Sequence, residues 1–210
     1  MLGRDNFADI EEILDTLEQN AEKINHHGKR ADGIVKSMMQ HARGSSGQRE
    51  LADINHLLDE AMNLVYHGLR AQDASFNITM EKDYDGAIGK LEVVPQDISR
   101  VFLNIVNNAA YAAHQKKKEN LDGFSPTLSV QTKNLGDKIE IRIRDNGNGI
   151  PADIREKIFN PFFTTKPAGQ GTGLGLSISY DIIVQQHRGE IRVETEEGEF
   201  TEFVVRLPRA

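Results

Sequence analysis

Residues 139–150 read Ile-Glu-Ile-Arg-Ile-Arg-Asp-Asn-Gly-Asn-Gly-Ile, an alternating apolar and polar run that ends in a carboxylate and two glycines. Such alternation predicts a half-buried strand. A second run of the same kind, Leu128 to Thr132, precedes it and is joined to it near Gly136 and Asp137. The two are therefore expected to pair as antiparallel neighbours. We expect further strands at Glu190 to Glu194 and Thr201 to Leu207, which turn at Glu197 and Gly198.

Helical patterns flank these strands. From about Pro95 to His114 the apolar residues recur at helical spacing, and the same holds from Ile54 to Val65. A strand is expected from Phe76 to Met80. Because strands and helices are grouped, we predict an α/β (α+β) two-layer sandwich with a mixed, mainly antiparallel sheet over residues 47–210, rather than a doubly wound sheet.

Residues 1–46 carry a different pattern, in which apolar or small residues alternate steps of three and four. Its members are Phe7, Ile10, Leu14, Leu17, Ala21, Ile24, Gly28, Ala31, Val35, Met38 and Ala42. That spacing keeps one seam along one side of a long coiled-coil-like helix and calls for a partner helix. An isolated helix of this kind is not stable in water, so we expect a homodimer formed through this element. The glycines and serines of residues 43–47 are expected to end the helix as a hinge.

Composition excludes several classes of protein. The chain of 210 residues is 38% hydrophobic and 27% charged, which is typical of a soluble globular protein. It has no cysteine, so disulfides and thiolate metal sites are excluded, and it has no run of about 18 apolar residues that would span a bilayer. No secretory leader is recognisable, and the cytoplasm is the expected compartment. The net charge of -7 argues against nucleic acid as a partner, and Lys116, Lys117 and Lys118 are expected to form a solvated helix end.

Four segments carry candidate chemistry. In the first, Asn104 and Asn108 stand four residues apart and project from the same face of the predicted helix. Their amides would be costly to bury without partners, and amide oxygens are suitable ligands for Mg²⁺. An interior amide network or a helix cap is the alternative explanation.

The second segment runs from Asp145 to Ile150, directly after the predicted strand. A carboxylate at a strand end can accept a hydrogen bond from an exocyclic amine, while glycines let the backbone pass close to a flat ring. An ordinary Asp-Asn-Gly turn is the alternative.

The third and fourth segments are aromatic and glycine-rich. Phe159 and Phe162 or Phe163 either anchor a flap whose Lys166 reaches phosphate or form a plug in the core. The run from Gly171 to Leu176 precedes a predicted helix start, where backbone N–H groups and the helix dipole favour phosphate.

In this order, the four segments resemble the N box, first glycine box, F box and second glycine box of the histidine kinase ATP-binding domain. That domain belongs to an ATPase superfamily that also contains DNA gyrase, MutL-type repair proteins and the ninety-kilodalton heat-shock chaperones. The resemblance extends from about residue 50 to the end of the chain. It implies a protein histidine kinase of two-component signalling that binds ATP and Mg²⁺, acts on a phosphoacceptor-histidine helix and serves a response regulator.

The resemblance also implies a role for each matching residue. Asn108 is expected to ligate Mg²⁺, with Asn104 supporting the metal or the phosphates, and Asp145 is expected to bond the adenine amino group. Asn104 and Lys166 are the expected catalytic residues. The remaining expected nucleotide contacts are Tyr111, Gly147, Gly149, Ile150, Phe159, Phe163, Gly171, Thr172, Gly173, Leu174, Gly175, Leu176 and Thr201, the last at a position that often shares a water with the adenine-binding aspartate.

Two of these positions depart from family patterns. The gyrase and chaperone branches place a water-activating Glu where this chain has Asn104, and an amide cannot take a proton at neutral pH. Slow hydrolysis and preferred transfer to a protein side chain are therefore expected. Tyr111 stands where many of these kinases have Lys or Arg.

The sequence does not contain the expected phosphoacceptor motif. The first helix of a complete kinase hairpin carries His followed by Glu or Asp and, a few residues on, Pro, whereas residues 6–43 resemble the second helix. His26 and His27 are the nearest candidate acceptors. The other histidines, His41, His56, His67, His114 and His187, are expected to be surface or packing residues. Two hypotheses follow: a catalytic portion that phosphorylates a histidine absent from this chain, or a non-catalytic ATP-binding and dimerisation module.

Overall fold

A computed structural model of the protein describes residues 10, 13–25, 27–28, 31, 47–119, 123–167 and 170–209. The chain divides into two compact units, one formed by Met1–Gly44 with Phe162–Leu174 and the other by Ser45–Pro161 with Gly175–Ala210. The expected domain boundary between residues 46 and 47 stays a prediction. Within the described ranges, no helix combines the length and the hydropathy that a membrane span requires.

The described N-terminal residues are helical, in a continuous run at 13–25. Along this run the predicted seam is exposed, because Leu14, Leu17 and Ile24 each keep more than half of their surface in contact with solvent. Phe7, Val35, Met38, Ala42 and the expected hinge at residues 43–46 lie outside the described residues. An apolar seam of this kind needs a partner surface, and the homodimer stays a prediction.

The larger unit is built on a five-stranded mixed sheet with the order β2-β4-β5-β7-β6. Its strands are β2 (Thr79–Asp83), β4 (Thr127–Asn134), β5 (Lys138–Asp145), β6 (Glu190–Glu196) and β7 (Phe200–Pro208). β2 and β4 are parallel, and each of the other neighbouring pairs is antiparallel. This arrangement confirms both predicted hairpins and the mixed, mainly antiparallel sheet.

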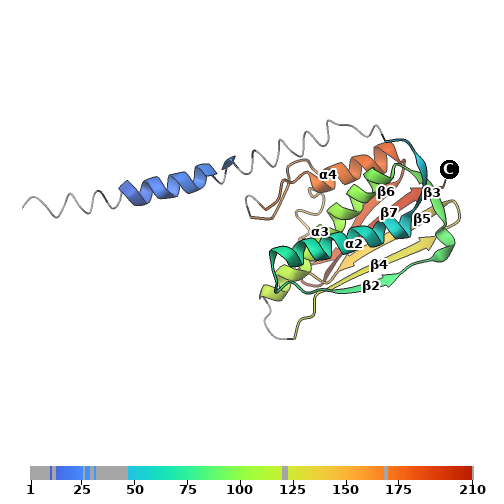
Figure 1. Cartoon of the computed structure of the whole chain (residues 1–210), viewed down its shortest axis with the longest axis horizontal. Coiled ribbons are helices and arrows are strands. Elements are labelled where there is room, and N and C mark those ends of the chain that lie inside the picture. The colour runs from blue at the N-terminus through green and yellow to red at the C-terminus, as the bar shows by residue number, and fades with distance from the viewer. Residues whose placement is uncertain are drawn as a thin grey trace, which may run out of the picture. The chain divides into compact units, whose positions relative to one another are not determined.

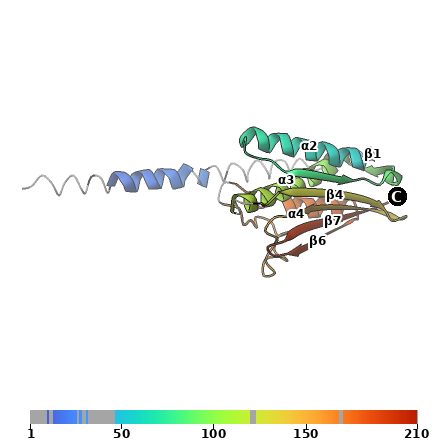
Figure 2. The same ribbon diagram turned by 90° about the horizontal axis from the view of Figure 1, so that it is seen from below.

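Helices α2 (Ile54–Gln72), α3 (Pro95–Glu119) and α4 (Gly175–Tyr180) lie on one face of this sheet (Figure 1, Figure 2). α3 begins at a proline, whose fixed φ suits the first helical turn, and its apolar stripe is buried. The strands bury alternate residues against that stripe, including Ile139, Ile141 and Ile143. Each such side chain contributes about 1.5–3 kcal/mol on burial, so this interface is the core of the predicted two-layer sandwich.

Three local features differ from the sequence prediction. β1 (Glu50–Asp53) and β3 (Lys90–Val93) form a separate antiparallel pair, with the short 3₁₀ turn η1 (Gly86–Ile88) before β3. The strand expected from Phe76 begins only at Thr79. Phe76 instead lies in the connection before β2, where its buried ring makes an edge contact with the His114 ring at 5.1 Å between centroids. After α4 the chain continues as a π-helix, η2 (Asp181–Gln186).

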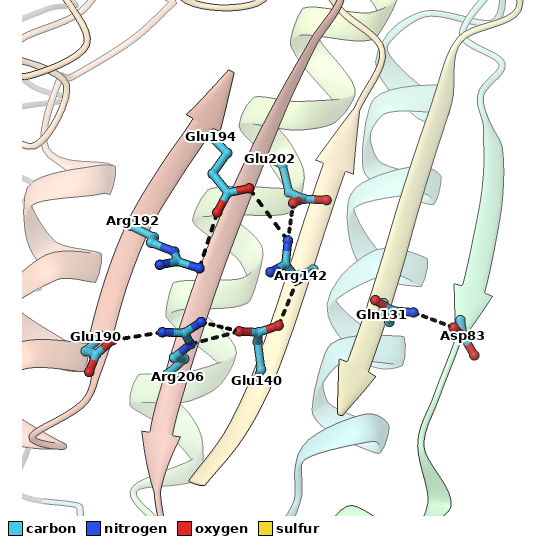
Figure 3. Close-up of polar contacts among 9 residues, drawn as sticks. All are labelled: Asp83, Gln131, Glu140, Arg142, Glu190, Arg192, Glu194, Glu202 and Arg206. Carbon is cyan, nitrogen blue, oxygen red and sulfur yellow. Dashed lines mark hydrogen bonds and ion pairs between the residues drawn. The ribbon is translucent and has the colours of Figure 1, made fainter. Parts of the chain in front are cut away.

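The face of the sheet opposite the helices carries an ion-pair ladder (Figure 3). The Glu140 carboxylate accepts hydrogen bonds from the Nε atoms of Arg142 and Arg206, both at 2.8 Å. Arg142 also donates to Glu202 at 2.6 Å, which links β5 to β7. Burial would raise the pKa of Glu140, but the hydrogen bonds from both arginines outweigh it and hold that pKa below its usual value.

His187 joins the end of η2 to the start of α3. Its ring is buried, Nε2 accepts a hydrogen bond from the Val94 N–H at 3.1 Å, and Nδ1 donates to the Ile182 carbonyl at 2.9 Å. Burial holds the pKa of His187 below its usual value, and the Arg49 charge acts in the same direction, while the Ile182 hydrogen bond and the Asp97 charge oppose them. The His187 side chain therefore packs in the core as a neutral imidazole.

Replacing His187 with Leu should lower the free energy of unfolding at pH 7.5 by about 1–3 kcal/mol, because the buried Val94 N–H loses its acceptor. The contribution of His187 is complete above its unfolded pKa of about 6.5 and is lost as the pH falls below it, because the unfolded state then binds the proton more readily. Urea unfolding at pH 7.5 and 5.5 measures this. The difference between wild type and variant should narrow at the lower pH, and a difference that widens would contradict the assignment.

Candidate functional site

Asn104 connects α3 to the start of α4. Its Nδ2 donates to the Gly175 carbonyl at 3.0 Å and to Ser179 Oγ at 3.2 Å. Ser179 Oγ donates in turn to the same carbonyl at 2.9 Å. The amide nitrogen is thus part of an interhelical network, one of the alternatives that the sequence leaves open. Its oxygen Oδ1 is the group left to accept a hydrogen bond or to ligate a cation.

Asn108 and Tyr111 follow on α3 and are half-buried. In the described part of the chain, no group of three or more His, Cys, Asp or Glu side chains is placed to hold a metal ion. Mg²⁺ does not require one, because it keeps several waters and takes one or two protein oxygens together with substrate phosphates. The amide oxygens of Asn104 and Asn108, on one face of one helix, fit that donor set.

Asp145 is the last residue of β5, and only 2% of its surface is exposed. Its Oδ1 accepts a hydrogen bond from the Gly147 N–H at 2.8 Å. Burial raises the pKa of this carboxyl to about 7, against the lowering effects of the Gly147 hydrogen bond and of the Arg144 and Lys116 charges. A partner that donates a hydrogen bond to this buried carboxyl would therefore stabilise its ionised form.

The loop after Asp145 passes close to other parts of the backbone. A Cβ at Gly147 would lie 2.6 Å from Asp145 Oδ1 and 2.8 Å from the Ala112 carbonyl carbon. Gly149 has a φ of 68°, and a Cβ there would overlap the Glu196 carbonyl. Glycine is therefore required at both positions.

The β6–β7 hairpin supports the loop from the other side. The Ile150 N–H donates to Thr195 Oγ1 at 2.9 Å, and the Gly198 N–H donates to the Asn148 carbonyl at 2.8 Å. Thr201, which is buried, lies directly opposite Asp145 in the β5–β7 register, so the two side chains share one face of the sheet. Five of the predicted site residues thus gather at one end of the sheet: Asp145, Gly147, Gly149, Ile150 and Thr201.

Lys116 differs from the sequence prediction. Its Nζ donates to the carbonyls of Asn146 at 3.1 Å, Gly147 at 3.2 Å and Gly198 at 2.7 Å. The expectation of a solvated helix end is therefore wrong for Lys116. It fails because the last turns of α3 pack beside the loop, which composition alone does not reveal.

The aromatic segment is split between the two units. In the larger unit, the Phe159 ring packs between Tyr180 and Phe203, with centroid separations of 5.7 and 6.4 Å. These contacts make the half-buried Phe159 a packing residue between α4 and the sheet. Its predicted contact with nucleotide stays a prediction.

Residues 162–174 belong to the unit that also contains the N-terminal helix. Gly173 has a φ of 69°, and a Cβ there would overlap the backbone of Phe162. The Lys166 N–H donates to Thr164 Oγ1 at 3.2 Å, and a Cβ at Gly171 would lie 2.7 Å from that oxygen. Burial lowers the pKa of the Lys166 ammonium.

In this segment the backbone at Gly173 passes against the backbone of Phe162, so glycine is needed at that position. Gly171 faces the side chains of Thr164 and Lys166 instead. The predicted roles of Phe163, Lys166, Gly171, Thr172, Gly173 and Leu174 toward a nucleotide stay predictions. Gly175 and Leu176 open α4, as the sequence predicts for the end of the glycine-rich run.

Two asparagines of the segment from Asp145 to Ile150 shape the site, although the sequence motif assigned no role to them. Asn146 Oδ1 accepts from the Thr127 N–H at 2.8 Å, and its Nδ2 donates to the Ser125 carbonyl at 2.9 Å. Asn148 Nδ2 donates to Glu119 at 2.7 Å. A loop with so many polar side chains beside a helix end is the only indication that the sequence gives of these anchors.

The fold and the site define a class of protein. The sequence profile described as histidine kinase-, DNA gyrase B- and HSP90-like ATPase matches residues 93–210. The chain belongs to this family.

Within the family, the chain carries a catalytic domain of the histidine kinase type. It is similar to the nucleotide-free catalytic domain of histidine kinase ThkA, with 30% identity, a TM-score of 0.63, and coverage of 77% of this chain and 96% of that one. Full-length ShkA, solved in complex with AMPPNP, has the same fold at 21% identity and a TM-score of 0.68, over 88% of this chain and 37% of that chain.

Curated relatives are longer. The sensor histidine kinase ZraS of Salmonella typhimurium is 28% identical over 198 residues, which are 94% of this chain and 38% of that protein. Sporulation kinase E of Bacillus subtilis is 31% identical over 180 residues, which are 86% of this chain and 22% of that protein. The chain thus spans less than two fifths of the length of these two relatives.

Replacing Gly149 with Ala should destabilise the protein through both a strained backbone and an overlap with the Glu196 carbonyl. The matched control is Gly136→Ala, because Gly136 has a φ of 93° and open space around the added carbon. The control should lose about 1–2 kcal/mol from the backbone conformation alone. Gly149→Ala should lose clearly more, as measured by denaturant unfolding. Equal losses would show that the close approach of loop and hairpin is not rigid.

Proposed function

We propose that this chain binds Mg-ATP and transfers the γ-phosphoryl group to a histidine on a helical hairpin. The observation that carries the proposal is the buried Asp145 carboxyl at the end of β5, beside a loop in which two positions admit only glycine. Homodimerisation through the N-terminal helix, a response regulator as the next acceptor and a cytoplasmic location belong to the same proposal.

Asp145 is the proposed purine anchor. Its carboxylate accepts a hydrogen bond from the exocyclic amine of adenine, while the backbone at Gly147 and Gly149 leaves room for the flat ring. Thr201, opposite Asp145, holds the water that the two side chains share with the base. A base with a carbonyl at the same position offers no donor to Asp145, so the site selects adenine over guanine.

The α3 amides are the proposed metal end of the site. Asn108 Oδ1 ligates Mg²⁺, and Asn104 Oδ1 supports the ion or the phosphates. When bound, Mg²⁺ neutralises the charge that develops on the phosphoryl oxygens during transfer. The glycines at 171, 173 and 175 cover the phosphates, with Lys166 and Tyr111 as further phosphate contacts.

Asn104 favours a kinase over a hydrolase. A water-activating base at this position would be a carboxylate, which could not donate the hydrogen bonds that Asn104 Nδ2 makes to Gly175 and Ser179. The position therefore supports an amide that orders the helices and takes no proton from water. Phosphoryl transfer then depends on positioning and on charge neutralisation.

The acceptor histidine is proposed to come from the hairpin of a longer chain or of a second chain. Neither His26, which lies outside the described residues, nor His27 has the acidic neighbour of an acceptor motif. The alternative function is a non-catalytic ATP-binding and dimerisation module. The lack of an acceptor motif at His26 and His27 supports this alternative as well.

Incubation with γ-labelled ATP and a separate helical hairpin that bears an acceptor histidine distinguishes the two functions. The expected result is label on the hairpin, at a rate well above the rate of phosphate release in the absence of the hairpin. The control is the same hairpin with His→Gln at the acceptor position. Fast release of phosphate with no labelled protein would contradict the kinase proposal, and ATP binding with neither product would support the binding module.

Asp145→Asn should reduce the affinity for ATP and abolish the preference for ATP over GTP, because the amide offers the adenine amine a donor as well as an acceptor. In wild type, the affinity for ATP should rise about tenfold from pH 6 to pH 8, because Asp145 must ionise and its pKa is raised to about 7. The variant should keep only the pH dependence that comes from the nucleotide phosphates. Titration calorimetry at both pH values checks this, and an unchanged affinity in the variant would show that the purine binds elsewhere.

The same carboxyl should also affect stability. The pKa of Asp145 in the folded state lies above its unfolded value of about 3.9. The protonated carboxyl therefore favours the folded state at low pH, and this contribution to the free energy of unfolding is lost as the pH rises toward 7. Nucleotide-free Asp145→Asn should therefore gain stability relative to wild type between pH 5 and pH 8. Thermal unfolding of both proteins across this range measures the difference.

A further inference from the structure

Lys116 occupies an uncommon position for a lysine near a helix end. Its ammonium group has three N–H donors, and the structure gives it three backbone carbonyls as acceptors, those of Asn146, Gly147 and Gly198. The same group lies 4.9 Å from the centroid of the Phe124 ring. The side chain is half-buried, so the charge is only partly hydrated.

The three carbonyls belong to two segments that the chain does not join locally. Asn146 and Gly147 follow β5 in the loop that begins at Asp145, whereas Gly198 lies in the β6–β7 turn. Carbonyl oxygens that converge on one point repel each other, and a cation between them removes that repulsion. Lys116 therefore holds the purine loop and the hairpin turn against each other.

The backbone of Lys116 is held in place by α3, on which it lies. Lys116 stands eight residues after Asn108 on the same helix, which corresponds to about 12 Å along the axis. Ala112, between them, lies against Gly147 so closely that a Cβ on the glycine would be 2.8 Å from its backbone. One rigid helix thus carries both the proposed metal ligand and the group that fixes the purine loop.

We infer that Lys116 is a positioning residue for purine recognition, which sets the distance between the Asp145 loop and the Asn108 end of the site without touching the base. The inference rests on the proposed adenine-binding role of Asp145. A lysine suits this task, because its compact ammonium presents three rotatable donors, whereas the planar fork of arginine matches carboxylate and phosphate geometry.

The test compares Lys116→Met with Lys116→Arg and with Lys117→Met. Methionine keeps an unbranched apolar side chain and removes the charge and the donors. Lys117 is the matched control, because the next residue on a helix points about 100° away round the axis. Affinities for Mg-ATP, Mg-GTP and Mg-tripolyphosphate are measured by calorimetry, with thermal unfolding of each variant alongside.

Lys116→Met should lose about tenfold in affinity for ATP, the order of one lost charge-assisted contact, and most of the preference for ATP over GTP. Its affinity for tripolyphosphate should not change, because that probe engages only the phosphate end. Lys116→Arg should recover part of the preference, and Lys117→Met should behave as wild type. Hydrogen exchange of the amides at 147–150 should be faster in Lys116→Met, with exchange in β2 unchanged, and this readout does not depend on ligand.

Three results would overturn the inference. One is a Lys116→Met variant that keeps the preference of wild type for ATP over GTP. Another is a parallel loss of affinity for ATP and tripolyphosphate, which would make Lys116 a phosphate contact or a general stabiliser. The third is a wild type without any preference for ATP, which would overturn the proposed function and this inference with it, whereas the first two leave the proposed function intact.

Discussion

The packing of α3 on the sheet is the constraint on which the other parts of the structure depend. Its apolar stripe is buried against β4 and β5, and this contact fixes the rotation of the helix about its axis. Once that rotation is set, Asn104 faces the start of α4 and Lys116 reaches the loop after β5. A helix that turned by one residue would displace both contacts, so hydrophobic burial in the core determines where the polar groups of the site stand.

The elements with strong periodicity are predictable from the sequence. β4, β5, β6 and β7 carry recognisable strand patterns, and turn residues separate the members of each hairpin, so both pairs are confirmed. The position of Asp145 at a strand end follows from the same alternation. The match between the four sequence boxes and the family predicted the class of protein, because their order carries more information than any single box.

What the sequence does not predict depends on contacts between distant residues. β1 and β3 are short and pair across an intervening helix, so neither has a local partner that a pattern could reveal. The amide of Asn104 bonds to a residue 71 positions away, and Lys116 bonds to Gly198 82 positions away. Phe76 continues an alternating run but lies in a connection, since tertiary burial overrides strand propensity there.

Lys116 holds the loop and the hairpin turn through three main-chain oxygens, and this has a consequence for how the protein tolerates change. A cation that recognises peptide carbonyls does not read the identity of the side chains that flank them. Exposed positions of the hairpin turn, such as Glu197 and Glu199, can therefore vary in chemistry while the anchorage of the loop is preserved. The tip of the hairpin can acquire new surface properties without disturbing the geometry beside Asp145.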